Sequence, residues 1–127
     1  MAIDPNDATV LNSKGLTLHA LGKNIDAITY LDKALAIRPN YTAALGNKGI
    51  VLGALGKNNE STAYFDKALA IDPNDVGSLN GKGVALANLG KYYEAIKYFD
   101  KALTLKPNYA TALDNKQKTL DLLKKQQ

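Results

Sequence analysis

The chain has 127 residues, of which 46% are apolar and 22% are charged, and this size and composition are typical of one globular domain. It contains no cysteine and a single histidine, His19, which excludes disulfides, thiolate metal sites, cysteine nucleophiles and metal sites built from several histidines. The net charge of +4 permits an acidic partner but does not indicate one. Residues 1–5 do not resemble a signal peptide and no segment is apolar for long enough to span a membrane, so we expect a cytoplasmic protein with no membrane association.

A step of 34 residues recurs along the chain. The pair Leu-Gly begins at residues 21, 55 and 89, and the pair Pro-Asn begins at residues 5, 39, 73 and 107. This step defines three complete repeats, at residues 8–41, 42–75 and 76–109. Residues 2–7 match residues 70–75 letter for letter, so we interpret residues 1–7 as the tail of a preceding, truncated repeat. We expect residues 110–127 to close the array, and all of these parts to form one domain.

Each repeat is predicted to form two helices. In the first repeat, apolar residues at helical spacing predict one helix over residues 8–21 and a second over residues 25–37. Gly22 is expected to end the first helix, and Pro39 to prevent the second from continuing. Two helices of this length cannot bury both of their faces alone, so we expect the pairs to stack as a solenoid.

Residues 110–125 are predicted to form one more helix, which resembles the first helix of a repeat. It keeps apolar residues at Leu113, Leu120 and Leu123, which we expect to face inward. Gln117 replaces the glycine found at this position in the repeats, and the helix closes with Lys124, Lys125 and two glutamines. We interpret it as a polar, solvating helix at a natural C-terminus, where basic residues suit the helix dipole.

This pattern resembles the tetratricopeptide repeat family. In the first repeat the resemblance is carried by Leu11, Gly15, Leu18, Leu21, Gly22, Ala27, Leu31, Ala34 and Pro39, and most of these residues recur one and two steps of 34 later. The resemblance implies an all-α fold, namely a right-handed superhelical solenoid of antiparallel helix pairs with seven helices. It also implies a non-catalytic scaffold that binds other proteins.

The chain departs from the family pattern at positions that bear on packing. Lysine stands before the glycine of each first helix, where the family usually has leucine, and we expect its stem to lie along apolar surface with its amine in water. In the second repeat Ser61 and Thr62 replace an alanine and an isoleucine, so we expect its second helix to be the least well packed. The aspartates that recur in the second helices are expected to form a solvated charge pattern; they are Asp32, Asp66 and Asp100.

In this family the first helices line the concave face, where most partners bind. The register therefore predicts a peptide-binding site made of three aliphatic residues and four asparagines, namely Leu16, Ile50, Val84, Asn12, Asn47, Asn80 and Asn88. Aliphatic side chains would contact an apolar peptide or helix, and an asparagine can both donate to and accept from a peptide backbone. The alternative for each asparagine is a surface residue bonded to water.

Four glycines, Gly46, Gly53, Gly77 and Gly81, flank these positions, although glycine inside a helix costs roughly 0.5–1 kcal/mol against alanine. Either they allow another backbone to approach closely, or they are simply tolerated in a stacked array. One subclass of the family grips a peptide carboxylate with lysines, asparagines and an arginine, and only Asn47 matches that set here. The sole arginine, Arg38, ends a second helix, so we do not expect such a clamp.

We therefore predict a protein or peptide partner of unknown identity, with no cofactor, no metal and no catalysis. Self-association is expected through the exposed N-terminal face, around Val10 and Leu21, or through the groove. The alternative is an RNA-binding helical repeat. The basic residues are spread over several faces and no basic stripe runs along the concave side, which disfavours nucleic acid.

Overall fold

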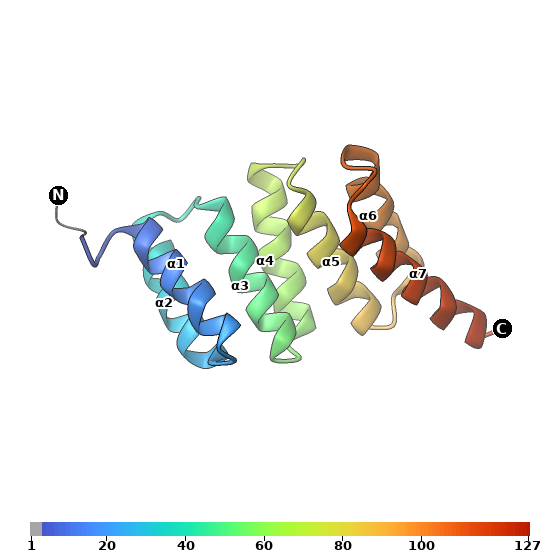
Figure 1. The fold of residues 1–127 in the computed structure, drawn as a ribbon, viewed down its shortest axis with the longest axis horizontal. Coiled ribbons are helices and arrows are strands. Elements are labelled where there is room, and N and C mark those ends of the chain that lie inside the picture. Colours follow the sequence, from blue (N-terminus) through green and yellow to red (C-terminus); the bar gives the residue numbers. More distant parts are fainter. Residues whose placement is uncertain (1–3) are drawn as a thin grey trace.

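The computed structural model describes residues 4–127, and these form seven α-helices and no strand (Figure 1). In chain order the helices are α1 (Ala8–Ala20), α2 (Asn24–Ile37), α3 (Thr42–Ala54), α4 (Asn58–Ile71), α5 (Val76–Asn88), α6 (Tyr92–Leu105) and α7 (Ala110–Lys125). Helix α1 ends one residue earlier than predicted, α2 begins one residue earlier, and α7 has the predicted limits. Residues 1–3 of the predicted N-terminal tail lie outside the described residues. No helix in the described part of the chain has the length and apolar character needed to cross a membrane.

The turns between the two helices of each pair share one conformation. Gly22, Gly56 and Gly90 have φ angles of 78°, 78° and 80°, a left-handed conformation that glycine adopts without strain. The amide of the next residue then reaches back into the helix, as in the hydrogen bond of 2.8 Å from the Lys23 N–H to the Leu18 carbonyl. This Schellman arrangement satisfies carbonyls at the end of the first helix and turns the chain into the second.

A large side chain of the second helix packs against a glycine of the first helix in every pair. A Cβ atom on Gly15 would lie 2.8 Å from Leu31 Cγ, and one on Gly49 would lie 2.9 Å from Phe65 Cε1. The same relation joins Gly83 and Phe99, with a distance of 2.5 Å. Such distances are too short for a real Cβ, so these glycines are required for the helices to approach each other.

Helix α4 is buried as well as its counterparts, so the prediction that it is the least well packed is wrong. Ser61, Phe65 and Ala68 are 1%, 2% and 0% exposed. The Ser61 hydroxyl donates a hydrogen bond of 2.6 Å to the Gly49 carbonyl, which satisfies a polar group that would otherwise be costly to bury.

Helix α7 packs against α6 through small side chains. Ala112 and Thr119 are buried, and Leu120 and Leu123 are half-buried. Leu113, which we expected to face inward, is 50% exposed. Its counterparts Leu11, Leu45 and Leu79 are covered by the second helix of their own pair, and none of the described residues supplies such a helix after α7.

The row of helices curves toward its first helices. Contacts join α1 to α3, α3 to α5 and α5 to α7, whereas α2, α4 and α6 do not contact one another. The first helices are therefore closer together than the second helices, and they form the inner face of the curve. In Figure 1 this row of first helices runs from α1 at the N-terminal end to α7 at the C-terminal end.

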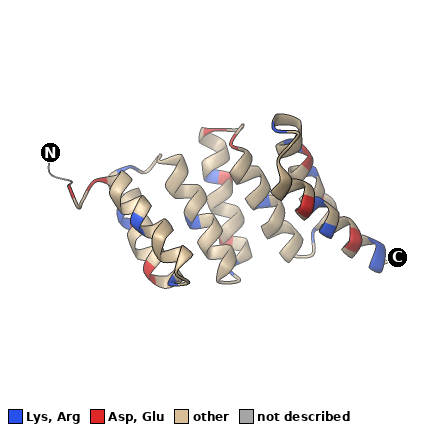
Figure 2. Cartoon of the chain, viewed as in Figure 1, with Lys and Arg blue, Asp and Glu red and all other residues tan. Residues whose placement is uncertain are grey.

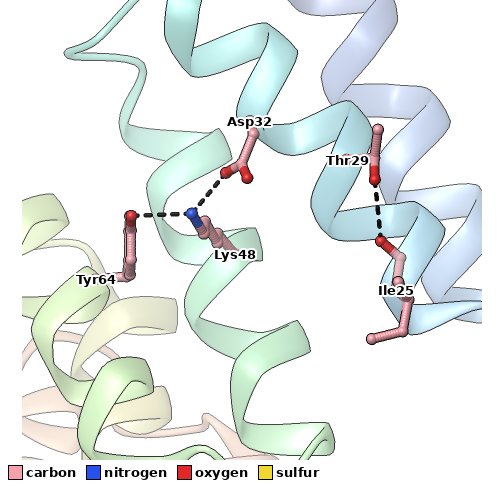
Figure 3. Close-up of polar contacts among 5 residues, drawn as sticks. All are labelled: Ile25, Thr29, Asp32, Lys48 and Tyr64. Carbon is pink, nitrogen blue, oxygen red and sulfur yellow. Dashed lines mark hydrogen bonds and ion pairs between the residues drawn. The ribbon is translucent and has the colours of Figure 1, made fainter.

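A lysine of each later first helix joins two repeats. Lys48 Nζ on α3 lies 2.5 Å from Asp32 Oδ1 on α2 and donates a hydrogen bond of 2.9 Å to the Tyr64 hydroxyl on α4 (Figure 3). Lys82 makes the equivalent contacts with Asp66, at 2.6 Å, and with Tyr98, at 3.0 Å. We call each set of three residues a lysine clasp.

The lysine clasps correct two expectations. The side chains of Lys48 and Lys82 are only 13% and 16% exposed, so their amines are largely withdrawn from water. The aspartates pair with the next repeat and are not free in solvent, although they remain about half exposed. Burial by itself would lower the pKa of Lys48 and Lys82, but the bonds to the aspartate and the tyrosine outweigh it and leave each pKa above its usual value.

Candidate functional site

The inner face is hollowed between α3 and α5. A pocket of about 530 Å³, which we call the central pocket, is bounded by these two helices, by α4 behind them and by the start of α7. Its apolar lining includes Ile50, Val84 and the Phe65 ring, and its polar lining consists of Asn58, Ser61, Asn80, Asn88, Tyr109, Thr111 and Asn115. The pocket therefore combines an aliphatic and aromatic surface with several neutral hydrogen-bonding groups.

Three glycines leave room for the central pocket. Gly53, Gly77 and Gly81 all line it, and each stands at a register position where another first helix carries a side chain. The counterparts of Gly53 are His19 and Ala87. The corresponding residues on α7 are Thr111 for Gly77 and Asn115 for Gly81.

The glycines differ in why a side chain is missing. A Cβ on Gly81 would lie 2.3 Å from Phe65 Cζ, so Gly81 is required by a ring inside the protein and not by a ligand. A Cβ on Gly53 or Gly77 would meet its nearest atom only at 3.4 Å or 3.6 Å, which is ordinary van der Waals contact. These two positions could accept alanine, and at each of them glycine keeps the pocket wider than the fold requires.

A smaller pocket of about 170 Å³ adjoins the central pocket. Ile50, Gly77 and Phe65 line both of them. Asn47 and Gly46 of α3 contribute to the smaller one, as does Asp75, the residue before α5. The two pockets thus form one continuous hollow, centred on Ile50, that extends along the inner face.

The structure brings together five of the seven residues predicted for the site. Ile50, Asn80, Val84 and Asn88 line the central pocket, and Asn47 lies in the adjoining one. Leu16 is exposed on α1, outside both pockets. Asn12 is only 6% exposed, and its Oδ1 accepts a hydrogen bond of 2.9 Å from Asn47 Nδ2. Asn12 therefore positions Asn47 and is too deeply buried to grip a ligand directly.

Other asparagines along the inner face are also linked in pairs. Asn115 Nδ2 donates to Asn80 Oδ1 at 3.1 Å, and Asn88 Nδ2 donates to Asn58 Oδ1 at 3.3 Å. Each pair uses one amide donor and one carbonyl acceptor, which leaves a donor group on one residue and an acceptor on the other. Asn58 and Asn115 were missed in the sequence, although the position of Asn115 two steps after Gly81 would have pointed to the inner face.

The two pockets contain no basic residue among their lining side chains. Helices α3 and α5 carry one charged residue each, Lys48 and Lys82, and both belong to lysine clasps (Figure 2). Asp75 is the only carboxylate in the lining. The site thus suits a neutral, largely apolar ligand and offers no cation to a carboxylate or a phosphate.

The remaining polar groups indicate no chemical site. His19 Nδ1 lies 2.7 Å from Asn24 Oδ1, a contact that links the end of α1 to the start of α2. Within residues 4–127 there is no group of three or more histidine, aspartate or glutamate residues arranged to hold a metal.

Comparison with known families agrees with the repeat and the fold. Models described as tetratricopeptide repeat match residues 6–74 and residues 77–109. The chain belongs to the tetratricopeptide repeat (TPR) family. Its seven helices correspond to three TPR units followed by a capping helix. A search of curated proteins found no match.

Solved TPR structures share the whole fold. The first TPR domain of the human RPAP3 protein is 25% identical, with a TM-score of 0.90 and 96% of both chains covered. The first TPR of Spaghetti (RPAP3), bound to the HSP90 peptide SRMEEVD, is 26% identical, with a TM-score of 0.87 over 95% of this chain and 96% of that one. YrrB, described as a TPR protein with an unusual peptide-binding site, is 25% identical, with a TM-score of 0.81 over 87% of this chain and 57% of that one.

Proposed function

We propose that this TPR chain is a non-catalytic interaction module that holds an apolar peptide or helix in the hollow on its inner face. The lining of the central pocket carries the proposal, because Ile50, Val84 and Phe65 offer apolar surface beside neutral amides and hydroxyls. Burying apolar surface gains roughly 25 cal/mol per Å², so a few such contacts supply several kcal/mol before the costs of ordering the ligand.

The peptide proposed here differs in chemistry from the one bound by a similar domain. The first TPR of Spaghetti binds the HSP90 peptide SRMEEVD, which ends in three acidic residues out of four. Charge-assisted bonds to such an end need lysine or arginine, and neither lines the pockets of this chain. The same lack of cations disfavours RNA, because binding of nucleic acid depends on contacts between basic residues and phosphates.

The test is a comparison of two peptide classes. Peptides rich in leucine and phenylalanine, selected on the immobilised chain from a random library, are expected to lose more than about tenfold in affinity with Ile50→Asp and Val84→Asp, since each change places a charge on an apolar contact. Lys97→Ala, on the outer side of α6, serves as the control and should leave the affinity unchanged. Affinities are measured by fluorescence anisotropy.

Salt separates the two modes of binding. Apolar contact should change little from about 0.1 M to about 1 M salt, over which the Debye length falls from about 10 Å to about 3 Å. The peptide SRMEEVD is expected to bind weakly or not at all. Tight, salt-sensitive binding of SRMEEVD that survives Ile50→Asp would show that a charged surface carries the function.

The same apolar hollow predicts self-association of the chain, through this groove or through the exposed face of α1. Sedimentation velocity over a concentration series measures it directly. A dimer held by the groove should weaken with Ile50→Asp, whereas a strictly monomeric chain near millimolar concentration would contradict this part of the proposal.

A further inference from the structure

Helices α3, α5 and α7 each receive the second helix of the preceding repeat on the same face. The residues at equivalent positions of this face are Ala44, Lys48 and Val51 on α3, then Ser78, Lys82 and Ala85 on α5, then Ala112, Lys116 and Thr119 on α7. Apart from the lysines, all of them are at most 3% exposed. Each lysine pairs with an aspartate of the helix that covers it, at 2.5–2.6 Å.

Helix α1 carries the same face without a covering helix. Its residues at these positions are Val10, Lys14 and Thr17, followed by Leu21 in the turn. Thr17 is exposed, whereas its counterpart Thr119 is 3% exposed. Leu21 is 67% exposed, whereas Leu123 of α7 is half-buried. The face is therefore open only on α1.

The polar groups of this face are already arranged for packing. The Thr17 hydroxyl donates to the Ser13 carbonyl at 3.0 Å, just as the Thr119 hydroxyl donates to the Asn115 carbonyl at 2.8 Å. In both cases the hydroxyl is satisfied within its own helix, so the methyl group can pack against a neighbour at little polar cost.

Lys14 forms half of a lysine clasp. Its Nζ lies 4.3 Å from the centre of the Tyr30 ring, as Lys48 and Lys82 lie 4.3 Å from the rings of Tyr64 and Tyr98. No carboxylate among residues 4–127 lies within ion-pair distance of Lys14. The aspartate that completes the other two clasps is the missing part.

We propose that the open face of α1 is a docking site for one further amphipathic helix that carries an aspartate opposite Lys14. The helices that cover α3, α5 and α7 define its chemistry. Each has an apolar residue directly before the aspartate and a leucine three residues after it, as in Phe65, Asp66 and Leu69 of α4. The occupant has the same sequence pattern.

A second copy of this chain does not fit the site as well. The three helices of the chain that carry the pattern are α2, α4 and α6, and their aspartates are already engaged by Lys48, Lys82 and Lys116. Another copy could supply such a helix only by separating two of its own repeats. A partner with an unengaged helix pays no such cost.

The experiment uses a fluorescent peptide with the sequence of residues 57–75, which contains α4 and the connector whose last six residues match residues 2–7. We expect saturable binding to the full chain in fluorescence anisotropy. Lys14→Glu should weaken it about tenfold, the value of one charge-assisted contact of about 1.4 kcal/mol. Lys97→Glu changes the net charge equally on an exposed part of α6 and should have no effect.

A charge exchange distinguishes the clasp from a general structural effect. Binding lost in Lys14→Glu should be regained by a peptide in which Asp66 is replaced by lysine, whereas that peptide should bind the unaltered chain weakly. Amide shifts in NMR spectra should move at Val10, Thr17 and Leu21. Shifts confined to Leu113 and Leu120 on α7, equal affinities of Lys14→Glu and the unaltered chain, or a dimer that excludes the peptide would each overturn the proposal.

Discussion

Phe65 connects the packing of the second repeat to the shape of the central pocket. Its ring lies against Gly49 of its own pair and Gly81 of the next repeat, so one side chain fixes the spacing of three helices. The pocket is then shaped by glycines of two kinds, of which Gly81 is required for packing and Gly53 is not. Changing each to alanine separates the needs of folding from the needs of binding.

We predict opposite effects on stability for these two substitutions. Gly53→Ala should raise the free energy of unfolding by up to about 1 kcal/mol, because alanine loses less backbone freedom in a helix, while it narrows the pocket and weakens the apolar peptide. Gly81→Ala should lower that free energy by about 1–3 kcal/mol, because its methyl group meets the Phe65 ring. Urea unfolding and anisotropy measure the two effects, and a stabilised Gly81→Ala would contradict the packing described here.

Single residues also mark the limits of sequence reasoning. The glycines before the turns and the apolar residues of the helices follow a period that was readable directly, and the helices formed where that period predicts them. The burial of Asn12 was not readable, because its partner Asn47 lies 35 residues away on a neighbouring helix. Lys48 was predicted to reach water, since nothing in its local sequence shows that Asp32 and Tyr64 converge on it from two other helices.

At the scale of elements, α4 differs from α2 and α6 in one half-buried position. Thr62 stands where the other repeats have Ile28 and Ile96, and its hydroxyl donates to the carbonyls of Asn58 and Asn59 at 2.9 Å and 2.8 Å. Both acceptors belong to the helix backbone, so the threonine gains little from these bonds and covers less apolar surface than isoleucine does.

Thr62→Ile should therefore raise the free energy of unfolding by up to about 1 kcal/mol, the order expected for burying one or two additional methylene groups. Thermal unfolding followed by circular dichroism checks the direction. Thr104→Ile, at an exposed position of α6, is the control and should have a smaller effect. A lower melting temperature for Thr62→Ile would mean that position 62 does not face the core.

The lysine clasps give the contacts between elements a dependence on pH. The pKa of Lys48 and of Lys82 is higher in the folded chain than in the unfolded chain. Their contribution to stability is thus complete below the unfolded value of about 10.5 and is lost as the pH rises through the folded value. The double variant Lys48→Met, Lys82→Met should be less stable than the unaltered chain at pH 7, and the difference should shrink above about pH 10.5. A difference that stays constant from neutral to alkaline pH would show that the lysines act through packing alone.

The whole molecule is held together by neighbours only. Each helix contacts the helices one or two positions away, and among residues 4–127 no contact joins the two ends of the row. The stability of such an array is approximately a sum of repeat and interface contributions, so the ends are expected to open first. The middle of the row has an interface on both sides, whereas α1 has one face open.

Native-state hydrogen exchange should resolve this gradient. Amides of α3, α4 and α5 are expected to exchange slowest, and those of α1 and α7 fastest, with intermediate rates in α2 and α6. Uniform protection along the chain would show that it unfolds as one cooperative unit. Slower exchange confined to α1 and α2 on addition of the peptide of residues 57–75 would report docking at the open face independently of fluorescence.

The three left-handed turns have a chemical consequence of their own. Because Gly22, Gly56 and Gly90 have φ near +80° and a Cβ there would meet nothing within 4 Å, the backbone at each turn is already in the conformation that a D-amino acid prefers. D-alanine introduced by chemical ligation would fit without strain and would restrict the unfolded chain, which stabilises the folded state, whereas L-alanine at the same place would be strained. The repeat therefore contains, once every 34 residues, a position at which the mirror-image residue is the better choice.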